Sequence, residues 1–415
     1  MIAALWTAAA TLATPALRFM LRRRAGRGKE IETRLQERSG HASAERPHGL
    51  LIWVHAASVG ETLSALPLLH ALPATVHILF TTGTVTSATL LRGRLAATPL
   101  ASRVIHQFAP LDVPRWAARF LDHWRPDAAC FLESELWPNL LSACRTRSIP
   151  AALINARLSA PSAARWARAG GFARQVLGSF AWIAAQSPAD AARLRALGAT
   201  CVDAPGNLKF AAPPLPAADR DLAELRASLA DRPRWLAAST HPQDDALIAQ
   251  THSALIARHP DLLTAIVPRH PERGAALAAL HHAPRRSQGQ WPNASGIWIA
   301  DTLGELGLLY RCFPIAVMGK SFAPPGGGQN PWEPAQLGCA VIGGPHMDNF
   351  AEAVARLTTT GGLITAQADS LAETIDALLS DPARTQAVGQ AARRATERDE
   401  ALPALLAARL ARLAA

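Results

Sequence analysis

The stretch of sequence that decides the fold is Ile315-Ala-Val-Met-Gly-Lys-Ser-Phe-Ala-Pro-Pro-Gly-Gly-Gly-Gln-Asn-Pro-Trp-Glu-Pro334. Its apolar residues 315–318 predict a buried strand, and the glycines after them predict a loop. Pro331, with Asn330 as a cap, predicts the first turn of a helix. Glycine permits positive φ and a close approach of ligand to backbone, and the N–H groups at a helix start favour phosphate. The order predicts a nucleotide-binding turn, with an ordinary glycine-rich connection as the alternative.

The same stretch supplies candidate contacts to a nucleotide. Glu333, one turn into the predicted helix, would reach a ribose diol. Lys320 belongs to a Gly-Lys-Ser sequence that is not a Walker A loop, because Pro314 stands where the first glycine is required. The candidates in and beside the loop are Lys320, Gly327, Gly328, Gln329, Asn330 and Glu333.

Composition describes a folded chain long enough for two domains. It has 415 residues, of which 49% are hydrophobic and 18% charged. The net charge is +10 and almost all cations are arginines, since the lysines are Lys29, Lys209 and Lys320. Lys209 and Lys320 fall in glycine-containing loops, where a compact ammonium suits an anion. Because the arginines are spread along the chain and one tyrosine is present, we expect no nucleic-acid partner; an anionic membrane or a charged substrate explains the charge as well.

Cysteine and carboxylate patterns favour a protein without a metal. The five cysteines are odd in number and have no paired spacing, which argues for a reducing compartment and against a zinc site. Asp219-Arg220-Asp221 resembles the metal-binding Asp-x-Asp of many glycosyltransferases, but it follows a proline-rich linker and not a strand. We therefore expect no metal site and no cofactor.

The N-terminal segment 1–24 is predicted to be a membrane anchor with a basic collar. Residues 2–21 are mostly apolar, interrupted by Pro15 and Arg18, and Arg22-Arg23-Arg24 follows. A cleaved signal peptide carries its positive charges before the apolar core, not after it. A short span and an interfacial helix both fit, and a buried helix of a soluble protein is the alternative. The arginines would keep the chain on the cytoplasmic side and contact anionic lipids.

Two α/β halves follow, predicted as domains 25–212 and 213–415. For the last helix, packing back on the first domain is an alternative to packing within the second. Short apolar runs alternate with amphipathic stretches in both halves, which predicts doubly wound, Rossmann-like parallel sheets facing a cleft. The alanine- and proline-rich residues 211–218 separate the halves. Ligands of such sheets bind at the carboxyl ends of strands. The predicted strands are 50–54, 77–81, 104–108, 128–132, 151–154 and 182–185, then 235–238, 262–267, 297–300, 315–318, 340–342 and 363–365.

Polar side chains follow the strands of the first half. Glu61, in the turn that contains Ser58 and Gly60, is either a general base or a first-turn acid favoured by the helix dipole. Two acids, Glu133 and Glu135, follow the fourth strand. We predict that they contact substrate, as do Ser58 and Gly60, and capping of a helix is the alternative for one of the acids. Asn155 and Arg157 offer donors after the fifth strand, and Lys209 precedes the linker.

Loops of the second half carry a similar set. Ser239 and Thr240 form a strand-to-helix turn with phosphate-loop character, and Arg269 and His270 follow a strand between prolines. Asp301-Thr302-Leu303-Gly304-Glu305 matches a capping box, which we interpret as mainly structural.

Several of these stretches, in order from about residue 50 to residue 365, resemble one family, the bacterial Kdo transferases (3-deoxy-D-manno-octulosonic acid transferases of lipopolysaccharide synthesis). The N-terminal anchor and collar are also similar to that family's. The matching stretches are His55–Thr62, Phe108–Pro114, Glu133–Asn139, Asn155–Ser159, Gly206–Phe210, Ser239–His241, Val267–Arg273, Asp301–Tyr310, Gly326–Glu333 and Gly344–Phe350.

The resemblance implies a GT-B glycosyltransferase with an acceptor-binding N-terminal domain and a CMP-Kdo-binding C-terminal domain. It implies Glu61 as catalytic base, and nucleotide contacts from Lys209, Ser239, Thr240, Arg269, His270, Asn330 and Glu333. The family's usual Arg-Gly-Gly-His-Asn reads Pro325-Gly-Gly-Gly-Gln329-Asn330 here, and Lys320 replaces its second glycine. We hypothesise that Lys320 offsets the missing arginine.

We therefore expect an inverting enzyme that moves Kdo from CMP-Kdo to a lipid A precursor, lipid IVA, at the cytoplasmic face of the bacterial inner membrane. One alternative is a membrane-associated GT-B transferase that uses a UDP-sugar. Another is a non-catalytic membrane-anchored binding protein of the same fold. The sequence predicts no particular protein partner.

Overall fold

The computed structural model describes residues 2–96, 98–292 and 296–415, and it divides into two compact units. Unit 1 comprises Met1–Ala212 and Asp399–Ala415, and unit 2 comprises Pro213–Arg398. The division after residue 212 falls within the alanine- and proline-rich stretch, and the N-terminal segment is grouped with unit 1. The chain re-enters unit 1 through its last helix, which packs against α3 (Val59–Ala71) and the sheet.

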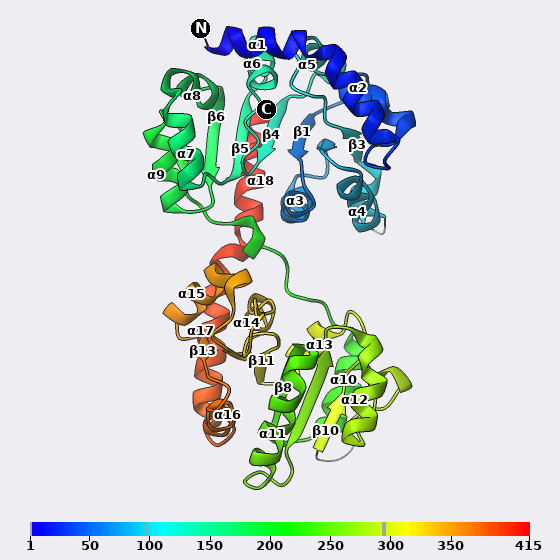
Figure 1. The fold of residues 1–415 in the computed structure, drawn as a ribbon, viewed down its shortest axis with the longest axis vertical. Coiled ribbons are helices and arrows are strands. Elements are labelled where there is room, and N and C mark those ends of the chain that lie inside the picture. Colours follow the sequence, from blue (N-terminus) through cyan, green and yellow to red (C-terminus); the bar gives the residue numbers. More distant parts are fainter. Residues whose placement is uncertain (1, 97, 293–295) are drawn as a thin grey trace. The chain divides into compact units, whose positions relative to one another are not determined.

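Unit 1 is a parallel sheet with the strand order β3-β2-β1-β4-β5-β6-β7 and helices on both faces (Figure 1). Alternate residues of β1 face opposite sides: Ile52 packs with α3, α4 and α18, whereas Trp53 packs with α5, α6 and α8. Burial on both faces explains why these strands read as continuous apolar runs. The strands are β1 (Leu51–Ala56), β2 (His77–Thr82), β3 (Val104–Phe108), β4 (Ala128–Leu132), β5 (Ala151–Ala156), β6 (Phe180–Ala185) and β7 (Val202–Asp203). The helices are α1 (Ile2–Leu12), α2 (Thr14–Ala25), α3, α4 (Val85–Leu95), α5 (Pro114–Trp124), α6 (Pro138–Thr146), α7 (Ala160–Ala167), α8 (Gly170–Leu177), α9 (Pro188–Ala196) and α18 (Leu402–Ala414), with 3-10 turns η1 (Glu32–Ser39), η2 (Pro99–Ser102) and η3 (Leu208–Phe210).

Unit 2 repeats the plan with the order β10-β9-β8-β11-β12-β13. The pairs of neighbouring strands are parallel. Its strands are β8 (Arg234–Thr240), β9 (Leu263–Pro268), β10 (Gly296–Ile299), β11 (Ile315–Met318), β12 (Ala340–Gly343) and β13 (Leu363–Thr365). Its helices are α10 (Asp219–Leu229), α11 (Asp245–Ile256), α12 (Gly274–His281), α13 (Leu306–Tyr310), α14 (Trp332–Gln336), α15 (Ala351–Thr359), α16 (Leu371–Leu379) and α17 (Pro382–Glu400), with 3-10 turns η4 (Pro242–Asp244), η5 (Pro271–Arg273), η6 (Arg286–Gln288) and η7 (Asp348–Phe350).

Each sheet reverses its strand order at one place, between β1 and β4 in unit 1 and between β8 and β11 in unit 2. Loops leave in opposite directions there, so the carboxyl ends of these strand pairs form the natural ligand sites. The predicted doubly wound α/β class is confirmed, and every predicted strand is present to within two residues at each end.

Some local predictions were wrong. Strand β7 was not predicted, because two residues give no periodic signal. The capping box at Thr302 does not form: α13 begins at Leu306, and Glu305 instead accepts hydrogen bonds from Thr302 and Arg286. Helix α14 begins at Trp332, one residue later than predicted, but the Asn330 side chain does accept a hydrogen bond from the Trp332 N–H at 3.1 Å.

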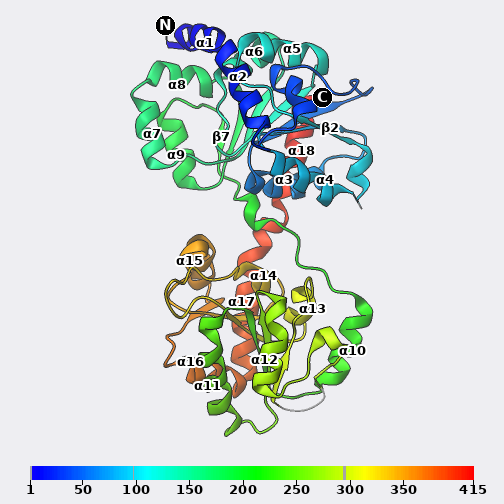
Figure 2. The same ribbon diagram turned by 45° about the vertical axis from the view of Figure 1, so that its right-hand side comes forward.

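The predicted anchor segment forms two helices, α1 and α2, bent by 55°. Among the described residues, no single helix has the length and apolar character to cross a bilayer; this bent pair passes that test only when its halves are taken together. Helix α1 lies beside α5 and α6 (Figures 1 and 2), where Trp6 donates to Asp112 at 3.0 Å and Thr7 to Asn139 at 2.8 Å. Leu12 and Phe19 are exposed.

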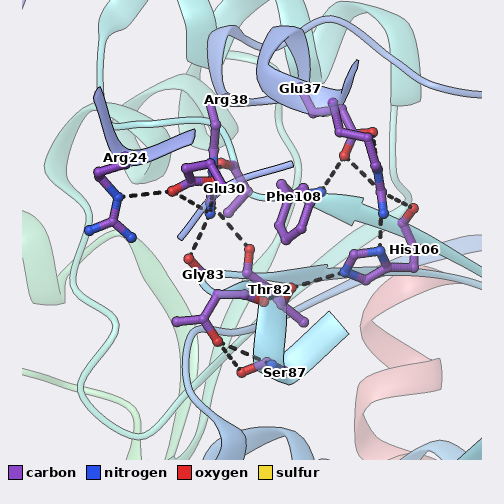
Figure 3. Close-up of polar contacts among 12 residues, drawn as sticks. Arg24, Glu30, Glu37, Arg38, Thr82, Gly83, Ser87, His106 and Phe108 are labelled. Atoms are coloured by element: carbon purple, nitrogen blue, oxygen red, sulfur yellow. Dashed lines mark hydrogen bonds and ion pairs between the residues drawn. The ribbon is translucent and has the colours of Figure 1, made fainter. Parts of the chain in front are cut away.

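The segment after α2 is fixed over the carboxyl ends of β2 and β3 by Arg38 (Figure 3). This buried guanidinium donates to the carbonyls of Thr82, Gly83 and Ala109 at 2.7–3.3 Å, and Glu30 balances its charge at 3.0 Å. Arg24 of α2 also binds Glu30, at 3.1 Å. Separating Arg38 from Glu30 would leave a buried charge unpaired, which is costly. The pair therefore holds this segment against the loops after β2 and β3.

Candidate functional site

Glu61 lies in the first turn of α3, directly after β1. Ser58 is the N-cap: its hydroxyl accepts from the Glu61 N–H at 3.3 Å and donates to Glu61 Oε1 at 2.7 Å. Oε2 accepts from the Ala57 N–H at 2.7 Å. Gly60 is exposed in the same turn, and a Cβ there would meet nothing within 4 Å. These bonds fix the direction of the Glu61 carboxyl group.

The environment of Glu61 favours proton acceptance. Its side chain is buried, with 8% of the residue exposed. Burial raises the pKa of Glu61, the Ser58 hydrogen bond opposes this, and the nearby charges of Glu135 and Glu133 raise the pKa further. A carboxyl group with a raised pKa is a stronger base than a surface glutamate. Glu61 does lie in the first turn of α3, as one of the two interpretations made from the sequence requires; its role as a general base stays a prediction.

Glu133 and Lys209 form an ion pair beside Glu61. The ammonium lies 2.9 Å from Glu133 Oε1, although its approach lacks the alignment of a hydrogen bond. Glu133 has φ +52°, which turns the chain sharply after β4. Lys209 lies in η3, which packs on α3, and 41% of its side chain is exposed. The pair therefore presents a cation to solvent next to a buried base.

Glu135 and Asn155 are held by protein contacts. Glu135 Oε2 accepts from His55 at 3.1 Å and from Trp137 at 2.5 Å. Asn155 is buried, and its Oδ1 accepts from the Leu208 N–H at 2.9 Å, which links β5 to the Lys209 loop. Arg157 is exposed after β5. The structure thus brings the predicted residues of unit 1 to one sheet edge, with Asn155 in a supporting position.

In unit 2, the turns after β8 and β11 lie against each other. Ser239 has φ +55° and Lys320 φ +58°. A Cβ on Gly319 would lie 2.5 Å from the Ser239 carbonyl, so only glycine fits. Asp244 ties the two turns together by accepting from the His241 N–H at 2.8 Å and the Lys320 N–H at 2.9 Å. Thr240 is fully buried, and its hydroxyl has no hydrogen-bond partner among the described residues.

The glycine loop packs on residues 344–350. Gly327 and Gly328 have φ of +105° and +71°, and added Cβ atoms would lie 2.5 Å from Asn349 and 2.4 Å from Met347. A polar hollow of about 510 Å³ opens here, lined by Lys320, Pro324, Pro325, Gly326, Gly327, His346, Asp348 and Asn349. The loop therefore shapes a polar recess with Lys320 at its wall.

Gln329 donates to His241 Nε2, 3.1 Å away, so this ring nitrogen accepts and carries no proton. Burial lowers the pKa of His241, and Asp244 opposes the shift. The ring of His270 meets that of His241 edge to face at 5.8 Å. His241 was not among the predicted site residues. Its position directly after Ser239-Thr240 could have indicated that it belongs to the site.

Asn330, Glu333 and Arg269 complete this group. Asn330 donates to Glu333 Oε1 at 3.0 Å. Burial raises the pKa of Glu333, which the Asn330 hydrogen bond and the charge of Arg269 oppose. Arg269 and His270 are exposed after β9. The group offers cations, amides and a carboxylate, which suits a phosphate and a sugar.

Asp301 and the Asp-x-Asp sequence have structural roles. Asp301 accepts from Ser287 and pairs with Arg285 at 2.9 Å. Asp219 and Asp221 lie in the first turn of α10. The residues that the structure describes contain no group of three or more His, Cys, Asp or Glu side chains that could hold a metal ion.

The family model described as 3-deoxy-D-manno-octulosonic-acid transferase (kdotransferase) matches residues 33–212. A probable mitochondrial 3-deoxy-D-manno-octulosonic acid transferase of Arabidopsis thaliana is 36% identical over 89% of this chain and 86% of its own length. This chain belongs to the Kdo transferase family. The Haemophilus influenzae transferase is 35% identical over 86% of each chain, and that of Bordetella pertussis is 34% identical over 90% of each. The predicted family is confirmed, and the chain is a glycosyltransferase.

Solved structures agree on the fold. A glycosyltransferase from Rickettsia africae has a TM-score of 0.53 at 13% identity, covering 88% of this chain and 98% of its own. MurG of Acinetobacter baumannii has a TM-score of 0.51 at 13% identity, covering 87% and 99%. At these identities the match concerns the fold alone, two Rossmann-like domains of the GT-B kind.

Proposed function

We propose that this member of the Kdo transferase family transfers Kdo from CMP-Kdo to a lipid A precursor with inversion at the anomeric carbon. The observation that carries the proposal is the buried Glu61, fixed by Ser58 and Ala57 at the switch point of unit 1. A hydroxyl of the acceptor has little nucleophilicity until a base removes its proton, and Glu61 has the environment of a base.

In the proposed reaction, Glu61 takes the proton of the acceptor hydroxyl while the oxygen attacks the anomeric carbon. The new C–O bond forms as the bond from that carbon to the phosphate oxygen breaks, and CMP leaves with the electron pair. The leaving phosphate carries charge that fixed cations can meet. In the proposed reaction, Lys320 and Arg269 of unit 2 supply this positive charge.

Unit 2 is the proposed donor site. Ser239, Thr240, His270, Gln329 and Asn330 offer hydrogen-bonding groups near the glycine loop, and Glu333 can accept from a ribose hydroxyl. Lys320 lies beside the polar hollow, where a neighbouring phosphate or carboxylate would find its ammonium. This position supports the hypothesis that Lys320 offsets the arginine that the family pattern has and this chain lacks.

Unit 1 is the proposed acceptor site, and α1 and α2 the membrane contact. The exposed apolar side chains include Leu5, Leu12 and Phe19, and the collar Arg22–Arg24 follows them. Apolar side chains beside arginines suit an interface with anionic lipids. We propose attachment to the cytoplasmic face of the inner membrane through this pair of helices.

Release of CMP tests the proposal. Purified chain with CMP-Kdo should release CMP faster when a tetra-acylated lipid A precursor is present than when it is absent. With a UDP-sugar in place of CMP-Kdo, the release of UDP should not exceed background. Equal release with and without the precursor would contradict transfer, and a preference for the UDP-sugar would favour another GT-B transferase.

A further inference from the structure

His55 is a buried histidine that the proposed reaction does not use directly. It is the fifth residue of β1, with 2% exposed, and the sheet register pairs it with Thr81 of β2 and with Phe131 of β4. His55 therefore lies near the carboxyl ends of β1 and β4, the two strands that precede Glu61 and Glu135. A polar ring in such a place needs partners for both nitrogens.

The hydrogen bonds around His55 have one consistent direction. Trp53 Nε1 can only donate, so the Thr81 hydroxyl accepts from it at 2.8 Å. Glu135 Oε2, which also accepts from Trp137, lies 3.1 Å from His55 Nε2, and a carboxylate can only accept. Nε2 therefore carries the proton. The Thr81 hydroxyl then donates its own proton to His55 Nδ1, 2.9 Å away.

This chain of donors ends on an ionised carboxylate. Burial raises the pKa of Glu135, but the interaction with His55 and the hydrogen bond of Trp137 outweigh it, so the pKa is lowered. Trp137 and the buried His55 restrict rotation of the Glu135 carboxyl group. Glu135 is thus held charged and oriented by protein groups.

The charged side chains that act on Glu61 come from the loop after β4. Glu133 is offset by Lys209 of η3, which lies 2.9 Å away. Among the described residues, the carboxylate of Glu135 has hydrogen bonds with an imidazole and an indole, and no lysine or arginine forms an ion pair with it. Of the two carboxylates, Glu135 has the larger electrostatic effect on Glu61.

We propose that His55 is a positioning residue of the transfer reaction: it holds Glu135 as an ionised, oriented carboxylate whose charge strengthens Glu61 as the base. This inference rests on the proposed function of Glu61. It moves Glu135 from a contact with substrate, as predicted from the sequence, to a group that acts through Glu61.

The test is the pH dependence of kcat/KM for transfer in Glu135→Gln. Loss of a nearby negative charge lowers the pKa of Glu61, so the acid limb should move to lower pH. The affinity for CMP should be unchanged. Asp127→Asn is the matched control, because Asp127 lies before β4, at the opposite end of the same strand, and its limb should stay in place.

A second pair of variants addresses His55 itself. In His55→Gln an amide N–H can replace Nε2–H, so the acid limb should stay close to that of the unmodified chain. In His55→Leu the imidazole donor is lost and only the indole of Trp137 still donates to Glu135 among the contacts described, so the limb should move in the same direction as in Glu135→Gln.

An unmoved acid limb in both Glu135→Gln and His55→Leu, with transfer retained, would overturn the inference. A raised KM for the acceptor at an unmoved limb would also overturn it, by returning Glu135 to substrate binding. If Glu135→Gln does not fold, the two His55 variants decide alone. Absence of transfer by the unmodified chain would instead contradict the proposed function, so the two failures are distinguishable.

Discussion

The two sheets have the same strand order over six strands, and each has its own switch point. The loops at these two points differ. After β1 and β4, unit 1 carries the acids Glu61, Glu133 and Glu135. Unit 2 carries Ser239 at the end of β8, and Lys320 and the glycine loop after β11. The same scaffold thus supports a buried carboxylate site in one unit and an open, cationic, glycine-rich site in the other.

The two switch points are built in different ways, and each way suits a different chemical task. In unit 1 the acids are fixed mainly by side chains: Glu61 by Ser58 of its own turn, and Glu135 by His55 of β1. In unit 2 the shape depends on backbone, because Gly319, Gly327 and Gly328 stand where a Cβ would not fit. A base needs a fixed direction and a raised pKa, whereas an anion needs N–H groups and cations. The predictions below separate these two requirements.

The largest effect is expected in Glu61→Gln. Glutamine keeps the shape of the side chain: its oxygen can accept from the Ala57 N–H and its NH2 can donate to the Ser58 hydroxyl, but it cannot accept the acceptor's proton. Transfer should fall by about two to four orders of magnitude, while the dissociation constant for CMP stays within about twofold. Steady-state CMP release and calorimetric titration measure the two quantities. Near-normal turnover would exclude Glu61 as the base.

The next effect is expected in Gly319→Ala. The added Cβ would lie 2.5 Å from the Ser239 carbonyl and would push the turns after β8 and β11 apart. CMP affinity should fall at least tenfold, and the melting temperature should fall with it. Gly93→Ala in α4 is the control, because a Cβ there meets nothing within 4 Å. Unchanged CMP affinity in Gly319→Ala would separate these turns from the donor site.

A smaller effect is expected in Lys320→Ala. Loss of one charge-assisted contact corresponds to about 1.5–3 kcal/mol, or a loss of affinity for CMP-Kdo of about tenfold or more. Lys29→Ala, which removes an exposed lysine of unit 1, should leave the affinity unchanged. Equal affinities in the Lys320 variant and the unmodified chain would contradict the hypothesis that Lys320 offsets the missing arginine.

The last effect concerns the stability of unit 1 in acid. His106 accepts from Arg34 and donates to Thr82 (Figure 3), and burial with the charges of Arg34, Arg92 and Arg38 lowers its pKa to about 3. Below the ordinary value of 6.5, the unfolded chain binds a proton there and the folded chain does not. Stability should therefore fall as the pH decreases from about 6.5 towards 3, by at most about 1.4 kcal/mol per pH unit.

Unfolding in urea at a series of pH values checks this effect. His106→Gln, which cannot take up a proton, should lose less stability over that range than the unmodified chain. Parallel curves for the two proteins would show that His106 does not contribute to the acid sensitivity.

Much of the fold was predictable from sequence, because buried parallel strands read as apolar runs and the linker reads as alanine and proline. The order of residues at strand ends also placed Glu133 and Lys320 correctly on loops and Glu61 at a helix start. Ser239 was predicted to lie in a turn, but it is the penultimate residue of β8. What local sequence could not reveal was pairing across the sheet. His55 and Glu135 are 80 positions apart, and Asn155 meets Leu208 across 53.

The packing of α1 and the burial of Arg38 also depend on tertiary contacts. A run of apolar residues with a basic end predicts an anchor, but Trp6 finds its partner Asp112 in a distant loop. Arg38 was not singled out because a buried arginine and an exposed one look alike in sequence; burial follows from the carbonyls that converge on it.

Mass spectrometry of the product formed from CMP-Kdo and a tetra-acylated lipid A precursor tests the central claim most directly. The account predicts a product with the mass of the precursor plus at least one Kdo residue, formed by the unmodified chain and lost in Glu61→Gln. An unmodified precursor after complete consumption of CMP-Kdo would contradict it.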